Sequence, residues 1–329
     1  MSRRLASVPL ALRRWLAHWR LTPDAAHGPV LGARHPGLVC RDGRQRVYLK
    51  VSVLGDPGVD AEAEALAALQ RAEISGVPRV VRHAPGALAV EWLAGRTLYA
   101  HRRLRGEHVE RQVGTALARV HHGARDLLPG RLVSGELISR LVWTTPELYA
   151  ALGPAELELF RKVQADARAT ERLVWLLDTE TPEASAFVHG DLRQPNVLVG
   201  RRGVAFLDWE QSGQGDPARD LGMLLADDFA AWVAPRDAEE RLHFPALRAN
   251  ARALVSGWER ETGRLRRARP KALRTRVICW MAEALLRRVF TLAHHEGALG
   301  THGAWVLDAA LALLHTPAAQ ARRLLGGVA

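Results

Sequence analysis

Residues 189–210 read HGDLRQPNVLVGRRGVAFLDWE, and the fold can be worked out from this stretch. Two short apolar runs, VLV and VAFLD, flank GRRG, which is typical of two strands joined by a tight turn. Asn196 precedes the first run and Asp208 ends the second. Because a hairpin returns its last residue close to its first, these two side chains are predicted to lie side by side.

The polar residues of this stretch suit phosphoryl transfer. Asn196 and Asp208 offer hard oxygen ligands, which Mg²⁺ takes when it also binds substrate phosphates. Asp191 lies five positions before Asn196 on the same loop, near enough to face a substrate hydroxyl. One carboxylate base beside a magnesium-binding Asp/Asn pair is what this reaction requires, because there the protein mainly positions groups and neutralises charge.

Composition places the chain among ordinary globular proteins. Its 329 residues are 48% hydrophobic and 25% charged, which excludes a disordered chain. Cys40 and Cys279 are the only cysteines, which favours a reducing compartment over a disulfide framework or a zinc cluster. No apolar run is long enough to span a bilayer, and the basic N-terminus is a poor signal peptide. We therefore expect a cytoplasmic protein without a membrane partner.

The net charge of +11 comes almost entirely from arginine and favours anionic partners. The densest basic run, RLRRARPK at 264–271, is interpreted as a solvated turn between two helices rather than a nucleic-acid site. No zinc pattern or aromatic stacking motif supports nucleic-acid binding. No feature of the sequence indicates an oligomeric state.

The two halves of the chain differ in pattern. Before residue 92, RVYLKVSVL (46–54) follows an Asp-Gly turn signal, 60–74 favours a helix, and PRVVRH and ALAVEWL favour strands. After Gly95 the chain is mainly helical, apart from the hairpin of 189–210. The helices are predicted at 107–123, 155–178, 218–233, 247–262, 271–296 and 303–325.

Three motifs in this order resemble a known family. HGDLRQPN matches an H-G-D-x-x-x-x-N catalytic loop, FLDWE matches a metal-binding Asp followed by Trp-Glu, and GDPARDLG (215–222) matches the segment that follows. This combination is similar to the aminoglycoside phosphotransferase and choline kinase superfamily, whose fold resembles protein kinases. The resemblance implies an α+β bilobal fold. A small β-rich N-lobe (1–92) would be followed by a hinge (93–98) and a larger helical C-lobe (99–329).

The resemblance also implies a nucleotide site. Lys50, within VYLKV, sits where the family keeps its phosphate-binding lysine. Glu62 and Glu64 are both candidates to pair with it, and Glu62 matches the family's position better. VEWLAGRTL (90–98) resembles the interlobe hinge, whose backbone would bond to adenine, here at Glu91, Trp92 and Leu93.

Catalytic roles carried over from the family fall on the opening stretch. Asp191 would accept the proton of the attacking hydroxyl, while Asn196 and Asp208 would hold magnesium. Arg193 would reach the transferring phosphate, with a plain surface arginine as the alternative. His189 is expected to brace the loop through backbone hydrogen bonds. Three further residues are expected to be structural: His121 in its helix, and Asp216 and Asp220 in the loop after the metal site.

The predicted function is phosphoryl transfer from ATP, or GTP, to a hydroxyl of a small molecule such as an antibiotic or natural-product metabolite. The choice of nucleotide stays open because no G-x-G-x-x-G motif precedes Lys50. The alternative is a kinase of serine or threonine in a natural-product precursor peptide, whose acidic leader would dock on 264–271. A pseudokinase scaffold is disfavoured, because the lysine, the base and both metal ligands are present.

The acceptor is only weakly indicated. A polycationic aminoglycoside calls for an acidic pocket, and the candidate acids in the right region are Asp227, Asp228, Glu239 and Glu240. The C-terminal half has no dense acidic cluster, and the whole chain is basic. Electrostatics therefore weigh mildly against a polycation.

Overall fold

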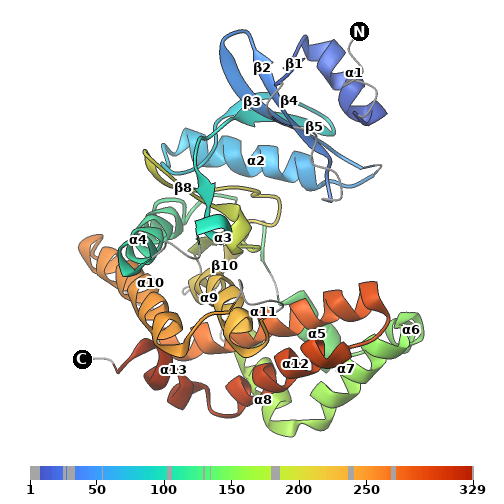
Figure 1. Ribbon diagram of the computed structural model, residues 1–329, viewed down its shortest axis with the longest axis vertical. Helices are drawn as coiled ribbons and strands as arrows, with labels where there is room; N and C mark the ends of the chain where they lie inside the picture. The colour runs from blue at the N-terminus through green and yellow to red at the C-terminus, as the bar shows by residue number, and fades with distance from the viewer. Residues whose placement is uncertain are drawn as a thin grey trace.

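The protein has a β-rich lobe stacked on a larger helical lobe (Figure 1), so the predicted α+β bilobal fold is confirmed. This computed structural model describes residues 8–24, 27, 34–53, 55–101, 106–128, 130–133, 135–178, 186–235, 241–267 and 272–327. Within these residues, no helix is both long and apolar enough to cross a bilayer.

The upper lobe is built on an antiparallel five-stranded sheet in the order β1-β2-β3-β5-β4. At the β2–β3 turn, Asp42 pairs with Gln45, and Gly43 takes a φ of 61°, which glycine adopts without strain. The Asp-Gly turn signal is therefore confirmed. The strands are β1 (Thr22–Pro23), β2 (Gly37–Asp42), β3 (Gln45–Val51), β4 (Val80–Ala84) and β5 (Ala87–Glu91).

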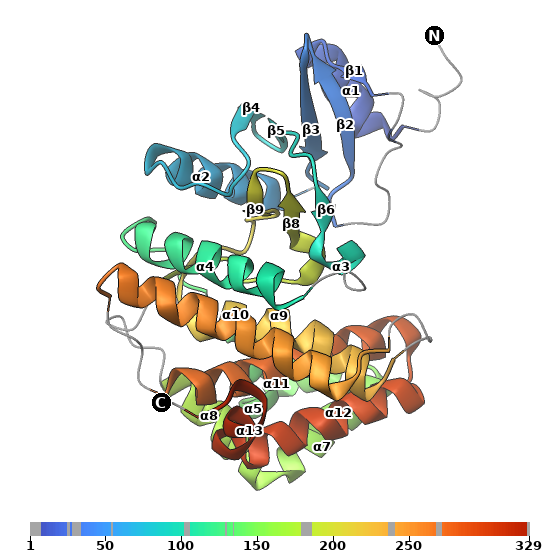
Figure 2. The same ribbon diagram turned by 60° about the vertical axis from the view of Figure 1, so that its left-hand side comes forward.

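Helices cover both faces of this sheet (Figures 1 and 2). Alternate side chains of a strand point to opposite faces. In β3, Val47 and Leu49 therefore pack against α1 (Leu10–Trp19), in a separate apolar cluster of the upper lobe. Lys50 points to the other face, toward α2 (Gly58–Arg71) and the lower lobe.

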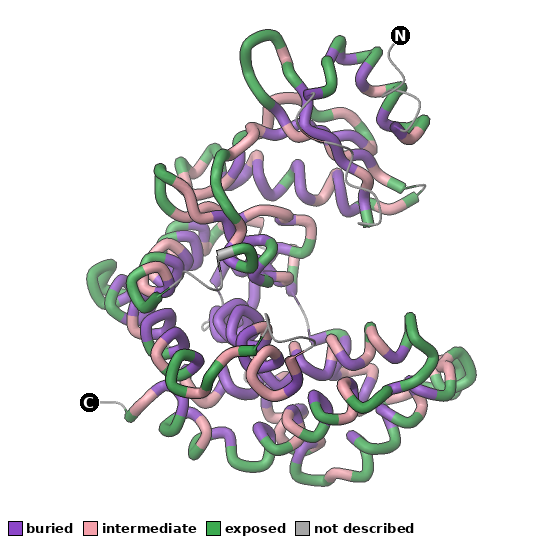
Figure 3. Tube along the Cα trace, in the orientation of Figure 1, coloured by how far each residue is buried: buried purple, intermediate pink, exposed green. Residues whose placement is uncertain are grey.

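The lower lobe is a bundle of helices around α9 (Pro217–Val233), whose residues are mostly buried at the centre of the molecule (Figure 3). Two short sheets lie above it. One pairs β10 (Gly213–Gly215) with β7 (Ala186–Val188), and the other has the order β6 (Arg96–Thr97), β8 (Val197–Gly200), β9 (Gly203–Phe206). The other helices are α3 (Leu98–His101), α4 (Glu107–Gly123), α5 (Glu136–Val142), α6 (Pro146–Ala151), α7 (Pro154–Ala165), α8 (Ala167–Asp178), α10 (Phe244–Arg264), α11 (Leu273–Glu296), α12 (Gly300–His315) and α13 (Pro317–Leu325).

Two of the predicted helices are each two helices, so those predictions were wrong. The segment 155–178 divides at Asp166, whose backbone is extended and whose Oδ1 accepts a hydrogen bond from the Ala169 N–H. The segment 303–325 divides before Pro317, which lacks the N–H that would continue the preceding helix. The basic run follows α10 as far as Arg267, and its last four residues, 268–271, lie outside the described part.

Candidate active site

The predicted hairpin brings Asn196 and Asp208 onto neighbouring strands. β7 (Ala186–Val188) leads into the catalytic loop, and β8 (Val197–Gly200) then pairs with β9 (Gly203–Phe206). The pairing continues below the strands, where the Leu207 N–H donates to the Asn196 carbonyl oxygen over 2.8 Å. Asp208 follows with a φ of 68°, a left-handed conformation that is uncommon for non-glycine residues and that aspartate adopts more readily than most.

Asp220, near the start of α9, holds the beginning of the catalytic loop. Its carboxylate accepts the N–H groups of His189 (2.7 Å) and Gly190 (3.0 Å) and contacts His121 Nε2 (2.9 Å). Trp258 donates to His121 Nδ1 over 3.0 Å, which makes this histidine structural. Burial alone would raise the pKa of Asp220, but these bonds lower it overall. Asp220 was expected to organise the loop after Asp208. It instead supports the start of the loop that carries Asp191.

His189 and Asp216 brace the two ends of the same region. His189 Nε2 lies 2.8 Å from the Leu207 carbonyl oxygen, which joins the catalytic loop to the strand carrying Asp208. Asp216 caps α9 through the Ala218 N–H (2.9 Å) and pairs with buried Arg276 at 2.6 Å. Both side chains serve the scaffold through hydrogen bonds.

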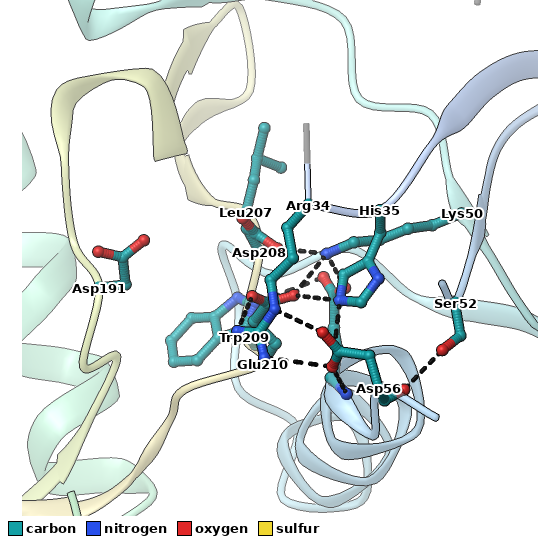
Figure 4. Close-up of polar contacts among 12 residues, drawn as sticks. Arg34, His35, Lys50, Ser52, Asp56, Asp191, Leu207, Asp208, Trp209 and Glu210 are labelled. Atoms are coloured by element: carbon teal, nitrogen blue, oxygen red, sulfur yellow. Dashed lines mark hydrogen bonds and ion pairs between the residues drawn. The ribbon is translucent and has the colours of Figure 1, made fainter. Parts of the chain in front are cut away.

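Lys50 is the centre of a carboxylate cluster (Figure 4). Its Nζ lies 2.8 Å from Glu62 and 3.1 Å from Glu210, and it also bonds to Asp208. Glu62 is buried and accepts the Trp209 N–H over 3.3 Å, so α2 is tied to the strand end. Burial would lower the pKa of Lys50, but the surrounding carboxylates raise it and keep the ammonium charged. The other candidate glutamate, residue 64, is exposed.

Asp191 lies apart from that cluster, across the site (Figure 4). Its side chain is 18% exposed, and burial raises its pKa, although Arg193 at 3.2 Å partly offsets this effect. The Asn196 amide donates to its backbone oxygen over 2.9 Å, which couples the two loop residues. The side chain of Arg193 is 55% exposed, so its guanidinium contacts Asp191 on one side and solvent on the other.

The residues present fit a divalent cation. The Asn196 amide nitrogen is used in the bond to Asp191, which leaves its oxygen as the ligand atom. Carboxylate oxygens of Glu62, Asp208 and Glu210 lie within 4.8 Å of one another. With the single ammonium of Lys50 among them, these three carboxylates leave a formal charge that a divalent ion would balance.

The acids expected near the acceptor serve the catalytic loop instead. Asp227 accepts the Gln194 N–H over 2.9 Å, and Asp228 accepts the Gln194 side-chain amide over 2.7 Å. Arg288 lies 3.7 Å from Asp227, whose pKa is raised by burial. These two aspartates therefore do not form an open acidic pocket, and Glu239 and Glu240 lie outside the described residues.

A cavity of about 950 Å³ lies against the predicted hinge. Its walls include Glu91, Trp92 and Leu93, together with residues of α4 and of the β8–β9 turn. Among the described residues, its lining contains neither Lys50 nor Asp191, so it lies beside the phosphoryl-transfer centre. The hinge thus has one side on this cavity, and its proposed contacts to adenine stay a prediction.

Sequence reasoning missed a second layer around Lys50. Glu210 was part of the quoted motif but received no role, although its Oε2 contacts Lys50 at 3.1 Å. Arg34, His35 and Asp56 surround Glu210 (Figure 4). The only available signal was the Trp-Glu of FLDWE, because Arg34 and Glu210 are 176 positions apart in the chain.

Solved structures share this architecture at low sequence identity. An aminoglycoside phosphotransferase from Alicyclobacillus acidocaldarius superposes with a TM-score of 0.60 at 17% identity, over 97% of this chain and 98% of that one. A choline kinase from Cryptosporidium parvum gives 0.55 at 14% identity, over 93% and 92%. An amicoumacin kinase solved with AMP-PNP and Ca²⁺ gives 0.62 at 11% identity, over 96% of each chain. At such identities the likeness shows the fold.

Sequence comparison settles the family. No curated protein matches the chain significantly. Residues 32–261 match the phosphotransferase enzyme family, and the match includes Lys50, the loop 189–196 and the β8–β9 hairpin. The resemblance predicted from three short motifs is confirmed: the chain belongs to the phosphotransferase enzyme family.

Proposed function

We propose that this phosphotransferase moves the γ-phosphoryl group of ATP to a hydroxyl of a small molecule, with Mg²⁺ as its metal. The observation that carries the proposal is the arrangement around one site of Asp191, Asn196, Asp208 and Lys50. The solved amicoumacin kinase binds AMP-PNP, and the other neighbours named above are aminoglycoside and choline kinases, which supports a nucleotide donor and a small acceptor.

Each residue has a distinct role in this proposal. Asp191 accepts the hydroxyl proton, helped by a pKa that burial raises toward the working range of a base. Arg193, at 3.2 Å from Asp191, offers a cation to the phosphoryl group during transfer. Lys50 binds the nucleotide phosphates and is held in place by Glu62.

The metal would be held by Asn196 and Asp208. When bound, Mg²⁺ would neutralise charge on the donor phosphates. The scaffold keeps both ligands in register, because the hairpin backbone joins residue 207 to Asn196.

The lobes divide the work in the same scheme. Residues 1–92 contribute the nucleotide-binding lobe, 93–98 the hinge, and 99–329 the catalytic loop and acceptor site. The backbone of Glu91, Trp92 and Leu93 would contact adenine through groups other than the Glu91 and Trp92 N–H, which donate to the Arg79 and Arg46 carbonyl oxygens over 2.8 and 3.1 Å. We place the enzyme in the cytoplasm, where the nucleotide donor is available.

The acceptor is an uncharged or anionic molecule rather than a polycation. Asp227 and Asp228 accept hydrogen bonds from Gln194, and Arg288 lies 3.7 Å from Asp227, so these carboxylates face the loop and a cation rather than an open acceptor pocket. Beside the base lies Arg193, and Arg287 also acts on Asp191 electrostatically. A peptide acceptor receives no support from the described residues, because half of its suggested docking run, 264–271, lies outside them.

The test is intact-mass detection of phosphate transfer from Mg-ATP, and in parallel Mg-GTP, to an acceptor panel. The panel contains aminoglycosides, macrolides, choline-like and sugar-like metabolites, hydroxy acids, and serine peptides with acidic leaders. Asp191→Asn is the matched control, because it keeps the side-chain shape but cannot act as a base. We expect its rate to fall by about 10²–10⁴.

The outcomes separate the candidates. A phosphorylated small molecule that disappears with Asp191→Asn supports the proposal and identifies the acceptor class. Transfer to the peptides alone would replace the small-molecule acceptor with a peptide. Nucleotide binding without transfer to any acceptor would favour a scaffold and count against the proposal.

A further inference from the structure

Arg34 occupies a position in the site that the proposed roles do not use. It lies just before β2, and its guanidinium reaches down between two carboxylates (Figure 4). Its Nε and Nη2 donate to both oxygens of Asp56, over 2.7 and 3.2 Å. Its Nη1 donates to Glu210 Oε1 over 3.2 Å. One guanidinium thus joins the upper lobe to the residue that follows the metal-site strand.

The guanidinium is one carboxylate away from the catalytic lysine. Glu210 bonds to Arg34 through Oε1 and to Lys50 through Oε2, the latter over 3.1 Å. The side chain of Arg34 is 55% exposed, whereas that of Glu210 is 8% exposed. The arginine therefore covers buried negative charge on one side and faces solvent on the other.

The side chains beneath Arg34 are closely packed. His35 is buried, with its Nε2 3.2 Å from Glu210 Oε2. Asp56 is fixed by the Gly58 N–H at 2.8 Å. A Cβ at Gly58 would lie 2.6 Å from His35 Nε2 and 3.2 Å from Glu210 Oε2, so any larger residue there would displace these side chains. This packing holds the guanidinium in one place, which is how a binding group is preorganised.

We propose that Arg34 binds the phosphates of the donor nucleotide, as a second fixed cation beside Lys50. The inference rests on the proposed function, since it concerns the donor of that reaction. No G-x-G-x-x-G motif precedes Lys50, so the sequence does not provide the glycine-rich loop whose backbone N–H groups would bind phosphate. A guanidinium offers forked donors that match phosphate oxygens, and Arg34 lies in the segment before Lys50 where such a loop would be expected.

The contacts of Arg34 in the structure hold its guanidinium in place before a nucleotide binds. Glu210 Oε1 and a phosphate oxygen would compete for the same Nη1 donor. The bonds to Asp56 are independent of that donor and would keep the side chain in position. Nucleotide binding therefore does not require a long, mobile side chain to become ordered, as it would for an arginine without these partners.

The test measures binding directly, by isothermal titration calorimetry with ADP, ATP and adenosine in magnesium buffer. The variants are Arg34→Ala and Arg34→Lys. Arg82→Ala is the control, because Arg82 makes a similar forked pair with Asp42 at 2.8 and 2.9 Å on the far part of the sheet. Arg34 is exposed, so its variants are expected to fold, and a thermal melt verifies this.

We expect Arg34→Ala to weaken ADP and ATP binding about 10–100-fold, the usual effect of losing a hydrogen bond to a charged group. Arg34→Lys should lie between alanine and wild type, since it keeps the charge but loses the fork. Adenosine affinity should be unchanged in both variants, and all affinities should be unchanged in Arg82→Ala.

Two results would overturn the inference while leaving the proposed function intact. One is unchanged or tighter ADP binding by Arg34→Ala, which would make Arg34 only a counter-ion of Glu210. The other is an equal loss of adenosine affinity, which would place the effect at the hinge. A wild-type protein that binds none of the three ligands would instead refute the proposed function, and the inference with it.

Discussion

Replacing Asp220 with alanine would remove an acceptor that three donors share at the start of the catalytic loop. The His189 and Gly190 N–H groups and His121 all contact this carboxylate, at 2.7, 3.0 and 2.9 Å. Asp220 is fully buried, so water cannot replace it without entering the core. The donors would be left unsatisfied inside the protein.

The expected cost follows from these contacts. Each buried donor left without a partner costs about 1–3 kcal/mol. Loss of the buried charge also removes its own desolvation penalty, so the three costs do not simply add. We expect Asp220→Ala to lower the free energy of unfolding by about 3–5 kcal/mol, the range for breaking a buried charged network. A typical domain has a total stability of about 5–15 kcal/mol, so this loss is at least a fifth of it.

Urea unfolding followed by tryptophan fluorescence measures this change. Asp220→Asn keeps the shape and one acceptor but turns an amide N–H₂ toward the remaining donors, so it should also be clearly destabilised. Glu107→Ala is the control, because Glu107 is exposed and its ion pair within the described part of the chain is with Arg111, at 3.5 Å and one turn away. Such a pair contributes about 0.5 kcal/mol or less.

Activity gives a second measurement of the same variant. Asp220 touches the two residues before Asp191, so their displacement would move the base, and a shift near 1 Å costs about 10²-fold in rate. A loss below about 1 kcal/mol in Asp220→Ala, or wild-type kcat in a folded variant, would refute the view that this carboxylate holds the loop.

Three other predictions follow from the same structure. The pKa of Asp220 is lowered in the folded protein, so its contribution to stability is complete above the unfolded pKa of about 3.9 and is lost as the pH falls through the folded pKa. Free energies of unfolding measured from pH 7 to pH 3 should therefore differ between wild type and Asp220→Asn, and this difference should shrink only below about pH 4. Gly114→Ala would push a Cβ into the Leu254 carbonyl oxygen of α10, so urea unfolding should show a free energy of unfolding lower by about 1–3 kcal/mol or more. Gly303→Ala, whose nearest neighbour would lie at 3.8 Å, should be neutral or stabilising by about 0.5–1 kcal/mol, and equal effects of the two variants would contradict the packing described. Lys50→Met leaves the three carboxylates, which lie within 4.8 Å of one another, without their ammonium, so magnesium should raise the melting temperature of this variant more than that of wild type. At ten times the Kd, bound magnesium should stabilise the variant by about 1.4 kcal/mol, and an equal or smaller rise in melting temperature would argue against a cation site there.

Local patterns in the sequence were enough for the hairpin and for most helix positions. The two apolar runs around GRRG predicted the β8–β9 turn because strand pairing there is set by neighbouring residues. The breaks at Asp166 and Pro317 also had local signals, an N-cap type of residue and a proline, but the surrounding apolar period was continuous enough to hide them.

Contacts between distant segments could not be read in the same way. Arg34 and Glu210 meet only because the upper lobe folds over the catalytic hairpin. Asp227 and Asp228 were expected at an acceptor pocket, yet the register of α9 turns them toward Gln194. Such pairings depend on the packing angle of whole elements, which side-chain periodicity does not determine.

The helix α1 also has a consequence for shortened forms of the chain. Leu12, Leu16 and Trp19 cover the sheet face formed by residues such as Val47 and Leu49. A protein that lacks residues 1–20 would keep every residue of the proposed active site but would expose this apolar face to water. Exposed sheet surfaces of this kind invite self-association. Loss of α1 would therefore be seen first as aggregation, with the chemistry of the remaining soluble molecules unchanged.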